Sequence, residues 1–432
     1  MIETTIDVPV EKAILVGVVL PNNKRWEVEE NLAELKLLAE TAGVEVVEFM
    51  IQERNRLHPA TFLGSGKVDE LSQLLKAKNG TVVIFDDDLS PAQTRNLEHA
   101  TDVKIIDRSS LILDIFAKHA RTRESKTQVE LAQLQYLLPR LTRQWSHLSR
   151  QVGGIGTKGP GETQLETDRR LVRNRIEFLR KELKKIERRH VTQRKGRRNM
   201  FKVSLVGYTN VGKSSIMNVL SGSDVLVENQ LFATLDSTTR IVRLNGDHEI
   251  LLSDTVGFIK KLPHHLIVSF KTTLDDIRDA DLLLHVVDAS QPGYQEQIQT
   301  VKQVLNEINI NGIPTLMVFN KIDLLDNKEL IGALKKQYAG SAFVSALRHI
   351  RINSLREQIK NIIEKSYVEY EIEVPIHSQT LVHFIHSKAI VTEQNYNEYT
   401  VHIRFKTSLS MKDKIFRTIQ GKLNNIIEKN HP

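Results

Sequence analysis

The sequence predicts an α/β protein of four parts: two open α/β domains, a long antiparallel helical arm between them, and a small α+β domain at the C-terminal end. Three observations indicate this architecture. Strand-like and helix-like runs alternate through residues 1–107 and again through residues 199–366. Between them, residues 108–198 carry apolar side chains at heptad spacing, and residues 367–432 contain short strand-like runs before a final helix. A chain of 432 residues is long enough for two to four domains.

The first α/β domain alternates apolar runs of strand length with amphipathic segments. Gly43 follows the first helix-like segment, at the position where glycine commonly caps a helix. Such alternation is typical of a small open α/β sheet. The strand-like runs lie at residues 13–20, 44–49, 81–85 and 103–106, and the helix-like segments at 27–42, 66–76 and 91–98.

Two features of this domain have both a structural and a functional interpretation. Gly64-Ser-Gly-Lys67 lacks the four-residue spacer of a phosphate loop, which favours an ordinary loop that caps a helix. Asp86-Asp87-Asp88 follows a strand, where α/β sheets bind ligands, but acidic residues before Ser90-Pro91 also suit a turn and a helix start. The structural interpretation is favoured for both, and a second nucleotide site is the alternative.

Two helices joined by a glycine-rich loop make up the predicted arm. Pro139 is expected to kink or split the first helix. The second helix, from about residue 163 to residue 190, would be roughly 40 Å long at about 1.5 Å per residue. Heptad-patterned helices joined by one loop are expected to pack as an antiparallel pair. The first helix has its apolar residues at a 4-3-4-3 spacing, at Leu134, Leu138, Leu141, Trp145 and Leu148.

The arm is strongly basic. Residues 118–198 contain 22 Lys or Arg and 8 Asp or Glu, although the whole chain has a net charge of only +7. A basic module in an otherwise acidic protein favours a polyanionic partner, although charges along helices also suit a solvated face. The loop Gln151–Glu162 is longer than a helix turn requires, so it is either a flexible connector or a tip that contacts the partner.

Composition excludes several classes of protein. The chain has no cysteine, which excludes disulfides and thiolate metal sites. No apolar run approaches the ~18 residues of a membrane span, and the first residues lack a basic-then-apolar signal segment. We therefore expect a cytoplasmic protein with no stable membrane insertion.

The second α/β domain opens with a complete phosphate-loop pattern. A strand-like run at residues 201–206 leads into Gly207-Tyr-Thr-Asn-Val-Gly-Lys-Ser214, which matches G-x-x-x-x-G-K-[ST], and a helix follows. Backbone N–H groups of such a loop surround phosphate oxygens, and the helix N-terminus adds its positive dipole end. Lys213 would reach the β- and γ-phosphates, and Ser214 would offer its hydroxyl to Mg²⁺. The predicted nucleotide contacts here are Gly207, Tyr208, Thr209, Asn210, Val211, Gly212, Lys213, Ser214 and Ser215.

Two segments after the phosphate loop supply groups for Mg²⁺ and the γ-phosphate. Thr234 follows the first helix and would complete the Mg²⁺ shell with Ser214. The strand at residues 250–254 ends in D-x-x-G, where Asp254 would hold Mg²⁺ through water and the Gly257 N–H would sense the γ-phosphate. We predict Lys213, Thr234 and Gly257 as the catalytic set.

The N-K-x-D motif indicates guanine. The strand at residues 315–320 ends in Asn320-Lys321-Ile-Asp323, and a later strand ends at Ser345-Ala346. The Asp323 carboxylate can accept both N1–H and the exocyclic amine of guanine, a donor pair that adenine lacks, and such a site can discriminate by ~10⁴-fold. The residues predicted to bind the nucleotide here are Asn320, Lys321, Asp323, Ser345 and Ala346. The ordered set predicts a P-loop GTPase domain and excludes a P-loop kinase.

Two positions bear on hydrolysis. Ras-like enzymes carry a water-orienting glutamine after D-x-x-G, whereas this chain has Phe258, whose ring can neither accept nor donate a proton. Intrinsic hydrolysis should therefore be slow unless a partner or a metal positions the water. Asn210 matches the asparagine that supports a monovalent cation in potassium-stimulated GTPases, and a loop-capping amide is an equally weighted alternative.

Longer stretches resemble a known family. They are similar to the HflX family of ribosome-associated GTPases, of the translation-factor-related class, over the chain up to about residue 366. A phenylalanine after D-x-x-G is also similar to that family. The stretches are Asp107–Phe116 (DRSSLILDIF), Gln128–Leu134 (QVELAQL), Leu138–Leu141 (LPRL), and Gly153–Arg170, which contains GPGETQLETDRR.

The resemblance implies a GTPase, with Mg²⁺ as cofactor and Thr234 as the switch threonine, that binds the large ribosomal subunit and its rRNA in the GTP state. It further implies splitting of stalled or idle ribosomes, with the arm reaching towards the peptidyl-transferase region. We expect a monomer that binds no DNA. The alternative is an RNA-remodelling ATPase or helicase that uses the N-terminal domain, with the GTPase domain as regulator, although that domain contains no convincing motif for it.

Residues 367–432 depart most from the family. We interpret residues 367–374, 381–384, 389–393 and 399–405 as strands and residues 411–427 as a helix. These elements predict a small α+β module that provides a second contact or an anchor on one subunit.

Overall fold

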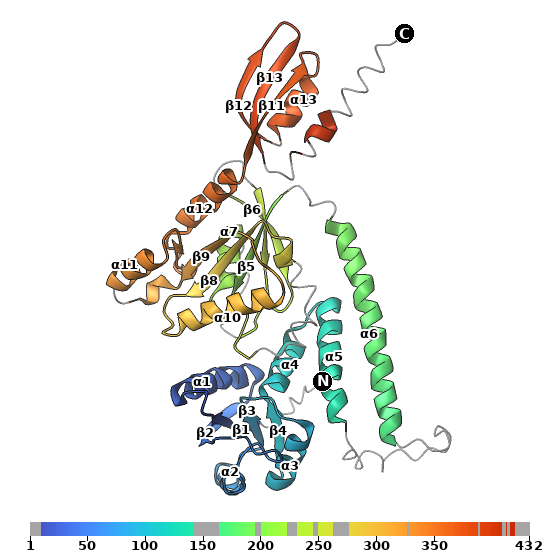
Figure 1. Ribbon diagram of the computed structural model, residues 1–432, viewed down its shortest axis with the longest axis vertical. Helices are drawn as coiled ribbons and strands as arrows, with labels where there is room; N and C mark the ends of the chain where they lie inside the picture. Colours follow the sequence, from blue (N-terminus) through green and yellow to red (C-terminus); the bar gives the residue numbers. More distant parts are fainter. Residues whose placement is uncertain are drawn as a thin grey trace, which may run out of the picture.

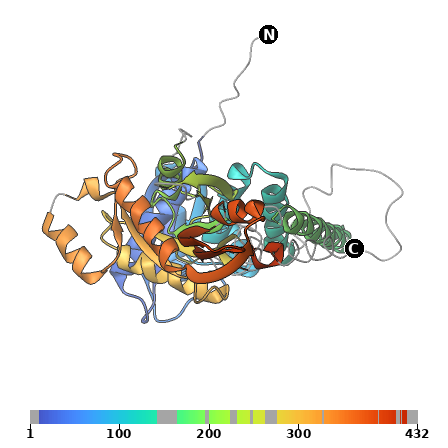
Figure 2. The ribbon, with the colours of Figure 1, turned by 90° about the horizontal axis from the view of Figure 1, so that it is seen from above.

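The computed structural model shows the two α/β domains and the C-terminal module stacked along one axis, with the arm beside them (Figure 1). Along that axis, α6 lies to one side of the stack (Figure 2). The structure describes residues 10–141, 164–194, 200–222, 231–244, 249–261, 276–325, 328–387, 389–407, 412 and 415–419. Within them, no helix is long and apolar enough to cross a membrane.

The N-terminal domain is a four-stranded parallel sheet in the order β2-β1-β3-β4. Successive residues of β1 point to opposite faces, so Ala13 and Leu15 pack under α1 and α4, and Ile14 and Val16 under α2 and α3. Helices on both faces explain why the strands are apolar runs. The bounds are β1 Lys12–Val19, α1 Arg25–Ala42, β2 Glu45–Glu53, α2 Ser65–Lys78, β3 Val82–Phe85, α3 Pro91–Thr101, β4 Lys104–Asp107 and α4 Arg108–His119.

Helix α4 differs from the sequence prediction, which placed residues after 107 in the arm. Asp107 caps α4 by accepting a hydrogen bond from the Ser110 N–H at 2.9 Å. Leu111, Ile112 and Phe116 are buried in the same core as α1. Because α4 presents these apolar side chains to the sheet, it closes the N-terminal domain and the extended part of the arm begins after it. Gly43 caps α1 with φ 84°, as predicted.

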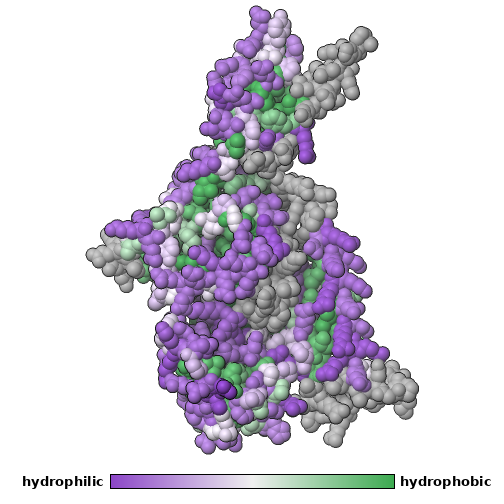
Figure 3. All heavy atoms as spheres, in the orientation of Figure 1, coloured by the Kyte–Doolittle hydropathy of each residue, from purple (hydrophilic) through white to green (hydrophobic). Residues whose placement is uncertain are grey.

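The arm is an antiparallel helix pair whose contacts run in opposite sequence order. Arg175 pairs with Glu130 at 2.7 Å, and Arg169 donates to the Leu141 carbonyl at 2.8 Å. Apolar side chains between the helices form a stripe flanked by hydrophilic ones (Figure 3). Pro139 ends the first helix in a 3₁₀ turn. The bounds are α5 Arg123–Leu137, η1 Leu138–Arg140 and α6 Gln164–Arg194. The predicted tip at residues 151–162 lies outside the described residues, as do Trp145 and Leu148.

The GTPase-type domain is a six-stranded sheet in the order β10-β9-β8-β5-β7-β6, parallel except for β6 against β7. Helix α10 covers one face, and α7 with α12 covers the other (Figure 1). The carboxyl ends of β5, β7, β8 and β9 therefore meet at one edge. The bounds are β5 Phe201–Gly207, α7 Lys213–Ser221, β6 Thr238–Arg243, β7 Glu249–Asp254, β8 Leu282–Asp288, α10 Tyr294–Glu307, β9 Thr315–Asn320, η4 Ile322–Leu324, α11 Lys328–Gln337, β10 Ala342–Phe343 and α12 Ile352–Lys365.

The C-terminal module is an antiparallel three-stranded sheet in the order β11-β13-β12 with a helix on one face. The predicted strand at residues 381–384 is wrong, because these residues lie in α13. Leu381 and Ile385, four residues apart, are both buried, which fits a helix; a short apolar run does not distinguish the two structures. The bounds are β11 Val368–Pro375, α13 Gln379–His386, β12 Ile390–Tyr396 and β13 Thr400–Thr407. Of the predicted final helix, residues 412 and 415–419 are described and helical.

Candidate functional site

A cavity of about 400 Å³ lies at the carboxyl edge of the six-stranded sheet. Of the residues predicted to bind nucleotide, those that line it are Thr209, Asn210, Gly212, Lys213, Ser214, Ser215, Thr234, Gly257, Asn320, Lys321, Asp323, Ser345 and Ala346. Gly207, Tyr208, Val211 and Asp254 do not line it and are buried. The lining also includes residues that the sequence analysis did not single out: Phe232, Ala233, Thr255, Leu324 and Leu347.

Two glycines, one at the end of β5 and one in the loop that follows, are required by geometry. Gly212 has φ 90°, and a Cβ on it would lie 2.3 Å from Nδ2 of Asn320. A Cβ on Gly207, at φ 154°, would lie 2.3 Å from the Val286 carbonyl oxygen. Gly212 is also the N-cap of α7. The loop therefore turns so that the N-terminus of α7, with its unpaired N–H groups, faces the cavity.

Lys213 is the buried cation of the cavity. Its Nζ donates to the backbone carbonyl of Tyr208 at 2.7 Å and to that of Gly207 at 3.3 Å. Burial lowers the pKa of Lys213 to about 8, with the carboxylate of Asp254 opposing the shift. A bound phosphate would add negative charge beside this amine and favour its charged form.

Ser214, Thr234 and Asp254 meet at one point of the cavity. The Ser214 hydroxyl lies 2.8 Å from that of Thr234 and donates to Oδ2 of Asp254 at 2.6 Å. Burial raises the pKa of Asp254, and the charge of Lys213 opposes this. Its other oxygen, Oδ1, is buried and has no hydrogen-bond partner among the described residues. Two hydroxyls and an under-satisfied carboxylate are hard oxygen donors, which fits Mg²⁺.

Asn320 and Lys321 connect the N-K-x-D segment to the phosphate loop. Asn320 donates to the Val211 carbonyl at 2.9 Å and accepts from the Ala346 N–H at 3.0 Å. Lys321 donates to the Asn210 carbonyl at 2.8 Å and pairs with Asp288 at 2.7 Å. Both side chains thus connect the walls of the cavity to each other. The Asp323 carboxylate remains as the group that can accept hydrogen bonds from a nucleotide base.

Comparison with known proteins gives matches along most of the chain. Family models match residues 29–117 (GTP-binding GTPase N-terminal), 119–197 (GTP-binding GTPase Middle Region) and 202–321 (50S ribosome-binding GTPase). The chain is 41% identical to GTPase HflX of Caldanaerobacter subterraneus over 407 residues. The matched residues cover 94% of this chain and 93% of the relative. The chain belongs to the HflX family of GTPases.

Two further HflX proteins and one solved structure are also similar to this chain. GTPase HflX of Flavobacterium psychrophilum is 52% identical over 313 residues, which cover 72% of this chain and 76% of the relative. GTPase HflX of Escherichia coli is 49% identical over 324 residues, covering 74% and 75% of the two chains. A GTP-binding protein from Sulfolobus solfataricus, solved with GDP, is 24% identical and matches 82% of this chain at a TM-score of 0.43. Membership of the HflX family makes this chain a GTPase that hydrolyses GTP to GDP and phosphate.

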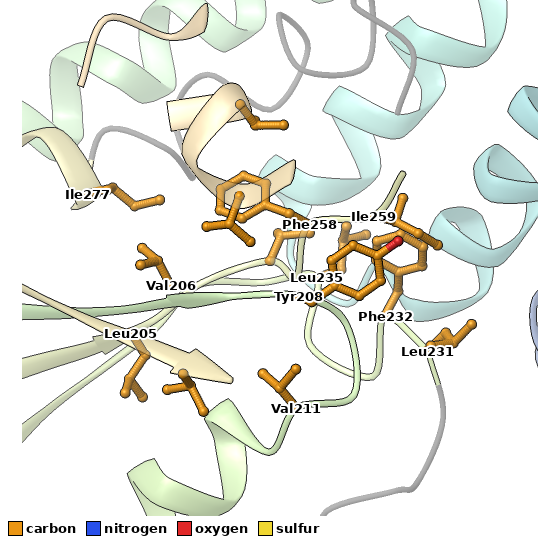
Figure 4. Close-up of a cluster of buried hydrophobic side chains, with 14 of the residues drawn as sticks. Leu205, Val206, Tyr208, Val211, Leu231, Phe232, Leu235, Phe258, Ile259 and Ile277 are labelled. Carbon is orange, nitrogen blue, oxygen red and sulfur yellow. The ribbon is translucent and has the colours of Figure 1, made fainter. Parts of the chain in front are cut away.

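In this HflX GTPase, Phe258 is a core residue. It is 3% exposed and lies among buried side chains that include Tyr208 and Ile259 (Figure 4). Its backbone N–H donates to the Gly207 carbonyl at 3.1 Å, and its carbonyl accepts from the Thr209 N–H at 2.8 Å. The residue before it, Gly257, is packed so closely that a Cβ would lie 2.9 Å from Nζ of Lys213. The segment after β7 is therefore docked on the phosphate loop by its backbone.

The two ambiguous features of the N-terminal domain have structural partners. Gly64 is the N-cap of α2, and Lys67 pairs with Glu70 at 2.8 Å. Asp86 binds the guanidinium of Arg108 at 2.8 Å, and Asp87 binds Lys261 at 2.6 Å. The acidic turn is thus neutralised by residues of the same chain. The described residues of this domain give no support to a second nucleotide site or to the ATPase alternative.

Proposed function

We propose that this chain is a GTP-switched factor that acts in the cytoplasm, binds the large ribosomal subunit and its rRNA, and splits stalled or idle ribosomes. One observation supports this most strongly: a guanine-nucleotide site and a long basic arm belong to one chain, and family matches span both. On α6, the exposed basic residues are Arg170, Arg173, Arg175, Arg180, Lys181, Lys184, Lys185, Arg188 and Arg189. Such a face suits the phosphate backbone of rRNA.

Each group of the cavity has a proposed role in GTP binding. Lys213 holds the β- and γ-phosphates, Ser214 and Thr234 hold Mg²⁺ directly, and Asp254 holds it through water. The bound Mg²⁺ would neutralise charge on the β- and γ-phosphates. The Gly257 N–H donates to the γ-phosphate, and it has no acceptor among the described residues.

The rate of hydrolysis follows from Phe258. Its buried ring leaves no side chain at this position to orient water, so turnover is slow alone and rises on the large subunit. Groups supplied in trans can be worth ~10³ to ~10⁵ in rate. Asn210, at φ 58° on the cavity wall, is proposed to support K⁺. Unchanged turnover when sodium replaces potassium would contradict that part.

Pelleting with isolated large subunits tests the ribosomal part of the proposal. We expect the intact chain to pellet with a non-hydrolysable GTP analogue and to stay in the supernatant with GDP. Binding should weaken steeply with salt, by ~10³-fold or more between low and physiological salt if the arm makes a handful of phosphate contacts. Charge reversal at Arg169 and Arg170 should weaken pelleting without changing GTP affinity. Equal pelleting in both nucleotide states would contradict the proposal.

A further inference from the structure

One large aromatic side chain is exposed in the middle of the basic arm. It is Phe178 of α6, a helix at the outside of the molecule (Figure 1), and 52% of its surface is accessible to solvent. The apolar cluster that joins α6 to α5 consists of other residues, which on α6 are Val172, Ile176, Leu179 and Leu183. Phe178 therefore takes no part in holding the two helices together, and its ring is available to a partner.

Arg175 fixes the surroundings of this ring. Its guanidinium lies over the ring of Phe178, 5.3 Å from the ring centroid. The same guanidinium donates to both carboxylate oxygens of Glu130 on α5, at 2.7 and 3.0 Å. Because such a two-pronged pair holds the guanidinium plane in one orientation, the ring has a fixed cation on one face. The rest of its surface is open to solvent and suits a second flat group.

Two lysines near the ring carry charge that the arm does not neutralise. Lys181 and Lys185 follow Phe178 by three and seven residues, spacings that place side chains on one face of a helix. Both are exposed, and neither has an ion-pair partner among the residues that the structure describes. The acidic residue between them, Glu182, binds Arg123 of α5. The potential beside the ring is therefore positive and attracts an anion.

An open aromatic ring beside unneutralised lysines fits single-stranded RNA. Unpaired bases stack on aromatic side chains, and cations bind the phosphates that connect those bases. Bases inside a duplex are stacked on each other and do not reach a protein ring, so the ring adds nothing to a contact with duplex RNA. An apolar protein segment fits this surface less well, because it would remove two charged lysines from water without pairing them.

We propose that Phe178 stacks on an unpaired base of an RNA strand, with Arg175 behind the ring and with Lys181 and Lys185 on the adjoining phosphates. The inference rests on the proposed binding of rRNA by the arm and deepens it, since it gives the arm a preference for single-stranded segments. Every base has a flat face that can stack, so the preference is for unpaired over paired RNA and not for one sequence.

Titration of the full chain with two labelled RNAs tests the proposal. One RNA is an unstructured single strand of about ten nucleotides, and the other is a duplex of the same length. Phe178→Ala should weaken single-strand binding about fivefold or more, through loss of one stacked base, and duplex binding less than about twofold. Phe178→Trp should keep single-strand binding. Its added tryptophan should be quenched more by the single strand than by the duplex.

Leu171→Ala is the matched control. Leu171 is 59% exposed on the same helix, seven residues before Phe178, but it has no aromatic ring. This variant should bind both RNAs as the unchanged chain does. Lys181→Ala should weaken binding of the single strand and of the duplex alike, since it removes a phosphate contact that both RNAs make.

Three results would overturn the proposal. They are an equal loss of both RNAs in Phe178→Ala, no loss of the single strand in that variant, and no single-strand binding by the unchanged chain. A loss in Leu171→Ala as large as that in Phe178→Ala would show an apolar patch for a protein partner and would also exclude stacking.

Pelleting with large ribosomal subunits separates this inference from the proposed function. If the unchanged chain pellets with the subunits but Phe178→Ala binds both RNAs normally, only the stacking is wrong. If Phe178→Ala loses the single strand alone but the unchanged chain does not pellet, the stacking holds and the ribosomal partner is wrong.

Discussion

The hydroxyl of Ser214 donates a hydrogen bond of 2.6 Å to the carboxylate of Asp254, which joins the first turn of α7 to the end of β7. A magnesium ion here would take the Ser214 oxygen as a ligand and lie near Oδ1 of Asp254, which has no hydrogen-bond partner within the part of the chain that the structure describes. The first prediction follows from this geometry. In the unchanged chain, EDTA should weaken GTP binding, and Mg²⁺ should restore it.

Ser214→Ala should remove that dependence on Mg²⁺, with a loss of about tenfold or more in GTP affinity when the metal is present. The measurement is a GTP titration with and without EDTA. Ser221→Ala, at the far end of α7, is the control and should keep the dependence. If Ser214→Ala still binds GTP more tightly with Mg²⁺ by the original factor, this hydroxyl is not a ligand.

Guanine recognition is predicted to depend on Asp323. Asp323→Asn should weaken GTP binding and favour xanthosine triphosphate, because the amide replaces one acceptor by a donor. We expect a reversal of preference of at least tenfold in competition titrations. Asn320→Ala should instead weaken both nucleotides together, since Asn320 braces Val211 and Ala346. Similar affinity of the unchanged chain for ATP and GTP would contradict this account of the base site.

Phe258 should matter for stability more than for chemistry. Phe258→Ala removes a ring that is 3% exposed, and such core truncations cost about 3–5 kcal/mol in the free energy of unfolding. At a temperature where the variant stays folded, its rate of GTP hydrolysis should remain within a few-fold of the unchanged chain. Urea unfolding and single-turnover assays measure the two quantities. A loss of rate as deep as that of Lys213→Ala would give the ring a role beyond packing.

His285 makes the fold sensitive to acid. Burial in the central strand β8 lowers its pKa to about 3, with smaller effects from Lys302 and Lys213. An unfolded histidine titrates near 6.5, so below that pH the unfolded state binds a proton that the folded state does not. Its contribution to stability is complete above about pH 6.5 and is lost as the pH falls towards 3, by up to about 1.4 kcal/mol per pH unit.

Urea unfolding at pH 7 and pH 5.5 checks the prediction. His285→Gln should flatten the dependence on pH even if it destabilises the protein, whereas His99→Gln, at an exposed position, should leave it unchanged. An identical pH dependence in the unchanged chain and in His285→Gln would rule out this histidine as the source.

Much of the nucleotide site could be predicted from the sequence because its motifs are local. Gly207 to Ser214 are contiguous in the sequence, and each further motif follows a strand whose carboxyl end must reach the same edge of the sheet. Features that depend on contacts between distant parts of the chain could not be predicted. Phe232 lines the cavity, but nothing beside it in the sequence indicates this. Asn320 and Lys321 match a nucleotide motif, yet their observed hydrogen bonds go to the phosphate loop.

The acidic turn shows the same limit. Asp86 and Asp87 lie after a strand, which is compatible with a ligand site, a turn or an ion pair. Only the fold shows that Lys261, far along the chain, reaches them. The prediction of a strand at Leu381–Phe384 was wrong for a local reason. A mostly apolar run of four residues fits a strand and a helix equally well. Boundaries such as that of α4 depend on which core a helix covers, and this is decided by packing.

Sedimentation of intact ribosomes in sucrose gradients tests the central claim most directly. The chain is mixed with ribosomes and GTP, a non-hydrolysable GTP analogue or GDP, and the fractions of intact ribosomes and free subunits are compared. The account predicts conversion to subunits with GTP and with the analogue, little with GDP, and none with Lys213→Ala at equal concentration. Equal conversion with GDP, or no conversion in any nucleotide state despite binding to the large subunit, would contradict it.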